Sequence, residues 1–564
     1  MCGEIPQKRV KEDDKLMVKG RFSRLIRRTL SVLTGVVLTL SVLSESRGVN
    51  AAELVQDTPA ATNQVAVVGA LIQGANVVVG TSGLAATDDG LYHLYAQETY
   101  QFGATGVEVA SAPANAAATF TFALNKNTAA SNLYKKFTVV GVQGGTLKVL
   151  SNSMFITNPE AVATHTAIRN DSGKKGIYPA ASATNGTFLT DMGIKKCCWT
   201  LNAPDFFAGG GVDYVYNGKP YSFNATLVGQ YDFLASAMKA RGIQLSLIIV
   251  NGWSADLTMV HPAARGGGGN YYAFNVCDQA GIERLEALGS FLGSRYGSDS
   301  KYGPIDNYII GNEVNATEWN YLPKSQYNIT AFTAEYEKAF RLLYNGIKSE
   351  NGSANVYISL DQEWLSNGDR RHFGVKEFLD NFNKIATSQG NYDWAVNDHP
   401  YNFPLYCPTV WAQLNQGSKV THSQNSPYVT MQNIDVLTDY LCQPALLSPT
   451  GQVRSVLISE VAYTSIGGAE SQQAASMVYA YRQCELNQYI DGFIYGRQLD
   501  HPTEIAQSRM ADGLFTSPDG FTTGSPKIAC SWFQQMDGPN AAAVRAQAAS
   551  VIGVSDLDSL MSPR

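Results

Sequence analysis

The sequence lacks the motifs of several common enzyme classes. It has no G-x-S-x-G segment, which excludes the nucleophile elbow of an α/β-hydrolase, and no H-E-x-x-H pair for a catalytic zinc. The D-H pairs at 398–399 and 500–501 match no familiar ligand spacing, so we expect no metal and no other cofactor. The glycine-rich segment at 265–270 neither follows a strand nor opens a helix, which predicts a flexible loop and not a phosphate site.

Long apolar runs are also missing, apart from one near the N-terminus. Residues 30–43 are apolar, follow a basic stretch and precede small residues at Val49 and Ala51, a pattern typical of a secretory signal peptide covering residues 1–51. The run is too short to favour a membrane span. Met17 would begin a more conventional signal peptide than Met1, so both start sites stay open. We therefore expect a secreted protein, free or associated with the cell surface, whose mature chain does not insert into a membrane.

Positive charge is scarce beyond the signal peptide. Residues 52–564 contain 32 Lys and Arg against 43 Asp and Glu, a formal charge of −11, which argues against a nucleic-acid partner. The same segment has an odd number of cysteines, too few and too dispersed for a disulfide framework. They are Cys197, Cys198, Cys277, Cys407, Cys442, Cys484 and Cys530. Buried free thiols are favoured, and a bridge between Cys407 and Cys442 is the alternative.

Two regions of different periodicity follow the signal peptide. Residues 52–163 contain short alternating or β-branched runs, such as "ATFTFALN" and "KKFTVVGV", separated by turn residues. This spacing predicts an all-β, immunoglobulin-like sandwich. Residues 164–564 alternate strand-like and helical segments instead. Eight strands are predicted at 176–181, 195–202, 244–253, 305–313, 355–364, 392–402, 455–464 and 490–500, with a last helix near 540–552. The chain therefore reads as an α/β protein, a (β/α)8 TIM barrel preceded by a small β-sandwich.

Two glutamates end strands of this series in the same way. Glu313 follows the apolar run "NYIIG" of strand four, and Glu460 follows "SVLIS" of strand seven. In such barrels the carboxyl ends of the strands form the active-site face, so both side chains are expected at the same mouth. Two facing carboxylates suit glycosidic bond cleavage, one as a protonated acid and the other as an ionised nucleophile.

An Asn-Glu pair after strand four together with a Glu after strand seven resembles clan A of the retaining glycoside hydrolases. The resemblance implies that Glu313 is the acid/base, Asn312 contacts the sugar 2-hydroxyl and Glu460 is the nucleophile. The segments "GNE", "DQ.W", "HPY" and "RQ.DHP" are most similar to a family of secreted bacterial proteins of unknown function. The usual strand-eight Trp of clan A is absent, since "FIYGRQLD" carries Tyr495 and Arg497 there.

Other strand ends offer the hydrogen-bonding groups and flat aromatic rings that bind sugars. The predicted substrate-binding residues, besides Asn312, are Trp253, Trp319, Asp361, Trp364, His399, Tyr401, Arg497, Asp500 and His501. Tyr321 is a further aromatic candidate in the strand-four loop. Each of these residues could instead be an ordinary rim residue with satisfied hydrogen bonds.

The sequence thus predicts a secreted retaining glycoside hydrolase that binds a polysaccharide or oligosaccharide and cleaves a β-linked glycan by double displacement. Two alternatives stay open. One is a non-catalytic carbohydrate-binding or surface protein built on the same barrel, and the other is a transglycosylase that uses the same residues. The glycan, the choice of endo or exo cleavage and the oligomeric state do not follow from the sequence.

Overall fold

A computed structural model of the protein describes residues 64–168, 171, 173–366 and 371–564. The predicted signal peptide lies outside these residues. None of the helices in these ranges has the length and apolar character that a membrane span needs. The seven cysteines from Cys197 to Cys530 are all free. This confirms the prediction of free thiols, although Cys277 and Cys442 are partly exposed and only the other five are buried, and the alternative bridge between Cys407 and Cys442 is absent.

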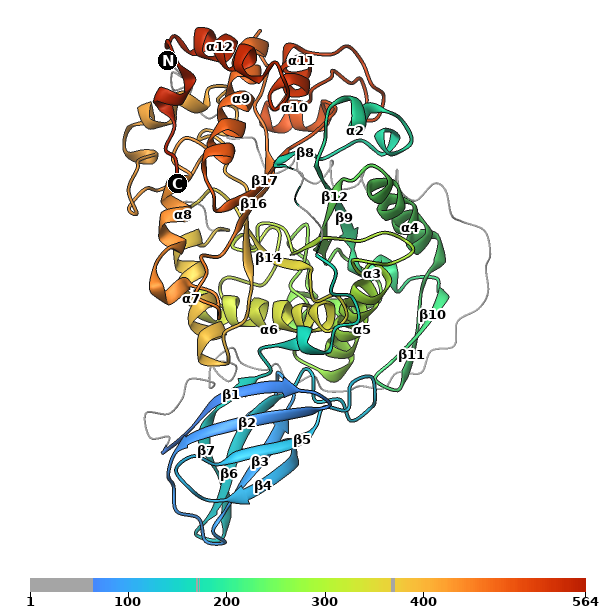
Figure 1. Ribbon diagram of the computed structural model, residues 1–564, viewed down its shortest axis with the longest axis vertical. Coiled ribbons are helices and arrows are strands. Elements are labelled where there is room, and N and C mark those ends of the chain that lie inside the picture. The colour runs from blue at the N-terminus through green and yellow to red at the C-terminus, as the bar shows by residue number, and fades with distance from the viewer. Residues whose placement is uncertain (1–63, 169–170, 172, 367–370) are drawn as a thin grey trace. The chain divides into compact units, whose positions relative to one another are not determined.

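The N-terminal all-β region consists of two antiparallel sheets (Figure 1), as predicted. One has the strand order β1-β2-β5 and the other β4-β3-β6-β7. The strands are β1 (Val65–Gln73), β2 (Asn76–Gly83), β3 (Leu91–Gln97), β4 (Val107–Pro113), β5 (Thr119–Ala123), β6 (Lys136–Gln143) and β7 (Thr146–Phe155). Alternate residues of β5 are buried, with Phe120 and Phe122 pointing into the core, because successive side chains of a strand point to opposite faces. The sandwich boundaries, 52 and 163, stay predictions.

Eight parallel strands close into a barrel, which confirms the predicted fold. In chain order they are β8 (Lys175–Ile177), β9 (Lys196–Asn202), β12 (Gln244–Val250), β13 (Asn307–Ile310), β14 (Asn355–Leu360), β15 (Ala395–Asp398), β16 (Val456–Val461) and β17 (Ile490–Tyr495). β17 pairs with β8 and so closes the ring. Strands such as β12 are buried almost throughout, because the barrel interior covers one face and the surrounding helices cover the other.

The helices surround these strands (Figure 1). They are α2 (Phe188–Asp191), α3 (Ala203–Phe206), α4 (Ala225–Ala240), α5 (Gln279–Arg295), α6 (Ile329–Lys348), α7 (Val375–Ser388), α8 (Asp435–Leu441), α9 (Glu470–Leu486), α10 (Pro502–Ser508), α11 (Ile528–Gln535) and α12 (Ala541–Ile552). Several begin at a capping side chain. Asn224, Asp278 and Asn328 each accept a backbone N–H bond from the first turn of α4, α5 and α6, which satisfies donors that a helix end leaves open.

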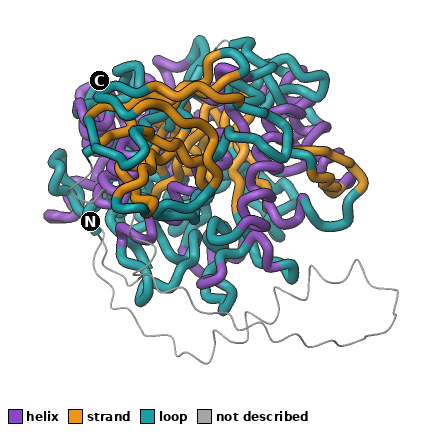
Figure 2. The backbone as a smooth tube through the Cα atoms, turned by 90° about the horizontal axis from the view of Figure 1, so that it is seen from below, coloured by secondary structure: helices purple, strands orange, loops and turns teal. Residues whose placement is uncertain are grey.

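Long connections follow several strands, and loops and turns make up much of the chain (Figure 2, teal). The connections from β12 to α5, from β13 to α6 and from β15 to α8 are the ones that concern the site. Two features depart from a regular alternation of strands and helices. The α-helix between β8 and β9 is the single turn α2, and a hairpin of β10 (Gly211–Tyr216) and β11 (Lys219–Asn224) interrupts the β9–α4 connection. Seven of the eight barrel strands also end earlier than predicted, the exception being β9, because the residues that follow them belong to the loops.

Candidate active site

The chain turns sharply where β13 ends, and this turn places Glu313. Gly311 and Glu313 both have left-handed backbone angles, with φ of +81° and +44°. Such a φ is uncommon for a residue with a side chain. The turn is held by β14, because the backbone N–H of Glu313 donates to Ser359 Oγ at 3.1 Å and that of Val314 donates to the Ser359 carbonyl at 2.8 Å. The Glu313 side chain is 16% exposed, so it is accessible yet fixed at its base.

A layer of polar side chains inside the barrel supports the site. Asn397 on β15 accepts a bond from the Ser459 backbone N–H at 3.2 Å, which fixes the orientation of its amide. Its NH2 group therefore faces Ser359 Oγ and His399 Nε2, each at 3.1 Å. Ser459 Oγ also lies 3.1 Å from His399 Nε2. These buried groups connect three neighbouring strands and lock the imidazole of His399 in one orientation.

His399 presents its other nitrogen to Glu313. Nδ1 lies 3.0 Å from Glu313 Oε1, and the ring is fully buried. Burial lowers the pKa of His399, but the charges of Glu460 and Glu313 outweigh this effect and raise it to about 9. Both glutamates therefore favour a doubly protonated ring, whereas the Asn397 NH2 group that faces Nε2 opposes a proton on that nitrogen. Nδ1 carries a proton in either state, and this proton bonds to Glu313 Oε1.

Tyr401 contacts the other glutamate from the same strand end. Its hydroxyl donates to Glu460 Oε1 at 2.9 Å. Burial and the charge of Glu460 raise the pKa of Tyr401 well above its usual value, so the phenol keeps its proton and remains a donor. His399 and Tyr401 are two residues apart, so one short segment after β15 contacts both the carboxylate that follows β13 and the carboxylate on β16.

Further acidic groups lie behind Glu313. Asp361 at the end of β14 accepts bonds from Asn315 Nδ2 and from the Glu363 backbone at 2.9 and 2.8 Å. Burial and the charge of Glu313 raise the pKa of Asp361 to about 7, although His372 opposes the shift. Asp398 is also buried, and its Oδ2 has no hydrogen-bond partner within the described residues. Burial raises its pKa well above the usual value, so both groups hold protons more readily than exposed aspartates.

The raised pKa of Asp361 predicts a pH-dependent stability. An unfolded aspartate has a pKa of about 3.9, so between roughly pH 4 and 7 the folded chain binds a proton that the unfolded chain has lost. Stability should therefore fall as the pH rises through this window, by up to about 4 kcal/mol for this one group. In Asp361→Asn the oxygen that bonds to Asn315 is kept and the titration is removed. Melting temperatures between pH 4 and 8 should fall less steeply in Asp361→Asn than in wild type, and identical slopes would contradict the assignment.

Arg497 lies near the other glutamate but is paired with acids. Its guanidinium forms an ion pair with Glu504 and lies 3.8 Å from Asp512 Oδ1. Burial raises the pKa of Asp512 to about 7, although Arg497 opposes the shift. Burial lowers the pKa of Arg497 itself, but the charges of Asp512 and Glu504, and after them that of Glu460, raise it. Neither acidic partner could be predicted from the sequence, because Glu504 and Asp512 follow β17 without any motif.

Aromatic side chains also lie near Glu460. Tyr271 is one of them, since burial and the charge of Glu460 raise its pKa. Trp319 packs at a tilt against Tyr271, with ring centroids 5.8 Å apart. Trp253 is 50% exposed and packs against Tyr272 at 5.2 Å. Trp253 and Trp319 stay predicted substrate-binding residues, whereas Tyr271 could not be predicted because nothing in its local sequence marks it.

The glycine-rich segment packs against the strand-four loop. A side chain on Gly268 or Gly269 would come within 2.6 Å of Tyr321. Gly268 also has a φ of +134°, so this close approach requires glycine. Tyr321 is half-buried and lies nearly perpendicular to the Tyr272 ring, with ring centroids 6.0 Å apart. Its role as an aromatic sugar-binding residue stays a prediction.

Three other predicted substrate-binding residues have structural partners. Trp364 is 1% exposed, packs edge-on against Tyr440 and donates to the Gln424 carbonyl, so its prediction as a substrate-binding residue is wrong in this structure. Asp500 is buried in an ion pair with Lys527 at 2.6 Å, which leaves it no role at an open surface. His501 packs against Phe521. Asn312 is half-buried beside Glu313.

Comparisons with known proteins give similar solved structures and one family of sequences. Among solved structures, this chain is similar to a family 39 glycoside hydrolase from the gut symbiont Bacteroides cellulosilyticus WH2, with 14% identity, a TM-score of 0.43 and coverage of 80% of this chain and 78% of that one. It is also similar to a hyperthermophilic beta-glucosidase from Pyrococcus furiosus, with 15% identity, a TM-score of 0.43 and coverage of 65% of this chain and 87% of that one. A third similar structure is the exo-beta-1,4-mannosidase Op5Man5 from Opitutaceae bacterium strain TAV5, with 14% identity, a TM-score of 0.38 and coverage of 69% of this chain and 63% of that one.

No curated protein sequence matches the chain. Residues 167–560 match a family described as a family of unknown function, DUF5722. This match includes all eight strands of the barrel and both glutamates. Because it spans well over half of the 564 residues, the protein belongs to the DUF5722 family.

Proposed function

We propose that the barrel is a retaining glycoside hydrolase that cleaves a β-linked glycan by double displacement. Glu460 attacks the anomeric carbon while Glu313 protonates the departing oxygen. A water molecule deprotonated by Glu313 then releases the sugar from Glu460. Asn312, next to Glu313, bonds to the sugar 2-hydroxyl, and Trp253 and Trp319 stack on sugar rings.

One observation carries this proposal. Two glutamates that are 147 positions apart in the sequence both meet side chains of the same segment after β15, His399 at 3.0 Å and Tyr401 at 2.9 Å. The contacts differ in kind, as the two roles require. Tyr401 only donates, which stabilises Glu460 as an anion and holds it for attack. The imidazole of His399 can both give and accept a proton, which suits a glutamate that changes protonation state during the cycle.

The experiment that tests the proposal is a screen of the protein against plant, algal, fungal and host β-glycans. Reducing ends report cleavage, and proton NMR of the first products reports their anomeric configuration. Retained configuration is expected. Inverted products would contradict double displacement, and transfer to added sugar acceptors in preference to water would identify a transglycosylase. Binding to a glycan without cleavage would support the non-catalytic alternative.

Tyr401→Phe should retain the fold and lose most of the activity. It removes the hydroxyl that donates to Glu460 and leaves the ring in place. Removal of one such donor typically costs about 10²–10³ in kcat, and KM should change little. Tyr463→Phe is the matched control, because the Tyr463 hydroxyl is buried without a hydrogen-bond partner in the described residues. Equal activity of the two variants would remove Tyr401 from the mechanism.

We also propose that the protein is secreted after cleavage near residue 51. The basic stretch and the apolar run at 30–43 support this proposal. N-terminal sequencing of protein recovered from the medium tests it, with a first residue close to position 52 expected.

A further inference from the structure

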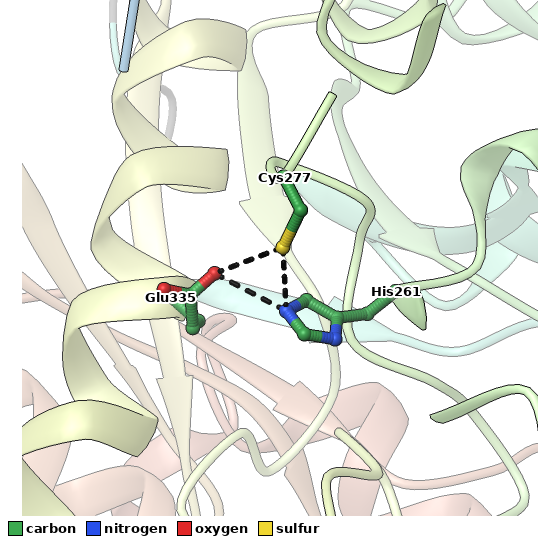
Figure 3. Close-up of side chains that lie close together, drawn as sticks. All are labelled: His261, Cys277 and Glu335. Carbon is green, nitrogen blue, oxygen red and sulfur yellow. Dashed lines mark hydrogen bonds and ion pairs between the residues drawn. The ribbon is translucent and has the colours of Figure 1, made fainter. Parts of the chain in front are cut away.

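A second cluster of reactive side chains lies away from the two glutamates. His261 precedes the short helical turn Pro262–Ala264 in the β12–α5 connection, Cys277 lies just before α5, and Glu335 belongs to α6. Their side chains point toward one another from two loop segments and a helix (Figure 3). His261 and Glu335 are 1% and 2% exposed. The mechanism proposed above uses none of the three.

The distances in this cluster are those of ligands around a common ion. Cys277 Sγ lies 3.0 Å from His261 Nε2 and 3.7 Å from Glu335 Oε2, and Nε2 lies 3.2 Å from Oε2. Sulfur, nitrogen and oxygen ligands about 2.0–2.3 Å from a tetrahedral zinc are roughly 3.3–3.6 Å apart. Shifts of a few tenths of an ångström would therefore let one ion reach all three atoms. Hydrogen bonds alone explain these three distances less well. Nε2 carries one proton, which can point either to Cys277 Sγ or to Glu335 Oε2 but not to both.

The surroundings hold these three atoms in position. Lys338 binds the other carboxylate oxygen of Glu335 at 3.0 Å, so Oε2 is left facing the cluster. The Cys277 backbone N–H donates to Asn275 Oδ1 at 3.1 Å, and the Tyr327 ring packs edge-on against His261. Such second-layer contacts orient the groups that bind a metal.

Metal binding also has a cost at His261. The Ala263 backbone N–H donates to Nδ1 at 3.1 Å, so Nε2 carries the ring proton while no ion is bound. When Nε2 binds a metal, this proton moves to Nδ1 and the Ala263 bond is lost, and the Cys277 thiol releases its proton to solvent. Affinity should therefore increase with pH.

We propose that His261, Cys277 and Glu335 bind one divalent transition-metal ion of the zinc type, with water as a fourth ligand. A thiolate, an imidazole and a carboxylate favour zinc over magnesium or calcium, which take oxygen ligands. The ion would cross-link the β12–α5 connection, through His261 and Cys277, to α6, through Glu335. That connection also carries Trp253 and Tyr271, so the metal would stabilise one wall of the candidate active site without taking part in the chemistry. The metal site does not depend on the proposed glycosidase activity.

Cobalt binding to the full chain tests the site directly, after removal of metals with a chelator. Thiolate ligation gives Co²⁺ a charge-transfer absorption band, and Zn²⁺ should bleach it on competition. We expect one equivalent to bind wild type, with the band lost in Cys277→Ser. In His261→Gln the affinity should fall at least about 100-fold, because even second-layer changes cost 10–100-fold. The matched control is Cys442→Ser, the other partly exposed free thiol after the predicted signal peptide, which should retain the band and the affinity.

Thermal melting provides a second measurement that does not depend on the cobalt spectrum. Zn²⁺ should raise the melting temperature of wild type and of Cys442→Ser but not of Cys277→Ser, because an ion that binds only the folded chain stabilises it. Circular dichroism checks that each variant folds. The proposal is overturned if folded wild type shows neither a thiolate band nor a melting shift, or if Cys277→Ser retains both.

Discussion

Replacing Glu460 by Gln is expected to reduce kcat/KM on a cleaved β-glycan by roughly 10⁴–10⁶-fold, the range seen when a residue essential to the chemistry is removed. The amide keeps the size of the side chain and can still accept the Tyr401 bond now found at 2.9 Å, so the fold should persist. It cannot attack the anomeric carbon, and the first step of double displacement therefore stops. Initial rates with wild type and variant on the same glycan give the ratio.

Two further variants separate loss of the nucleophile from loss of a charge. Glu485→Gln removes a carboxylate paired with Arg482 on α9 and should leave the rate unchanged. Glu460→Ala opens space in which added azide can attack, and the product should be a glycosyl azide of inverted configuration. A Glu460→Gln rate within tenfold of wild type would show that another residue is the nucleophile.

Replacing Glu313 by Gln is expected to have an effect that depends on the leaving group. General acid–base catalysis contributes about 10²–10⁴ in rate, so hydrolysis of natural glycans should fall by that factor. An aryl glycoside with an acidic phenol needs no protonation, so it should still form the intermediate on Glu460. That intermediate should then accumulate, because no base activates water. A burst of phenol equal to the enzyme concentration, followed by slow turnover, is the expected time course.

Glu318→Gln is the control for this variant. Glu318 lies in the same connection between β13 and α6 and pairs with Arg371 at the surface, so its loss should affect natural and aryl substrates alike, and only slightly. If Glu313→Gln slowed both substrate classes equally, with no burst, Glu313 would act in positioning and not as the acid/base.

The barrel could be predicted from the sequence because its signals are local. Each strand is a short apolar run bounded by polar residues, and helical segments separate the runs, so the eight strands could be counted directly. The placement of Glu313 and Glu460 followed from the same count, since each comes just after such a run. The contacts of His399 and Tyr401 could only be expected in outline, because they depend on strands that come together in the closed barrel.

Predictions that required knowledge of long-range partners were less successful. Trp364 follows β14 as an exposed ligand would, yet it is buried against Tyr440, a residue 76 positions later. Asp500 is paired with Lys527 from the segment before α11, and no local sequence pattern predicts that contact. His261, Cys277 and Glu335 are separated by 15 and 57 intervening residues and form no recognisable metal motif. Only the folded chain brings them together.

The most direct test of the central claim is to trap the covalent intermediate. Wild type is incubated with a panel of 2-deoxy-2-fluoro-β-glycosides that carry a good leaving group, because the fluorine slows release of the sugar more than its attachment. Mass spectrometry of the digested protein then locates the added sugar. The account predicts one sugar on the peptide that contains Glu460, and no label in Glu460→Gln. Label on a different carboxylate, or label that persists in Glu460→Gln, would contradict it.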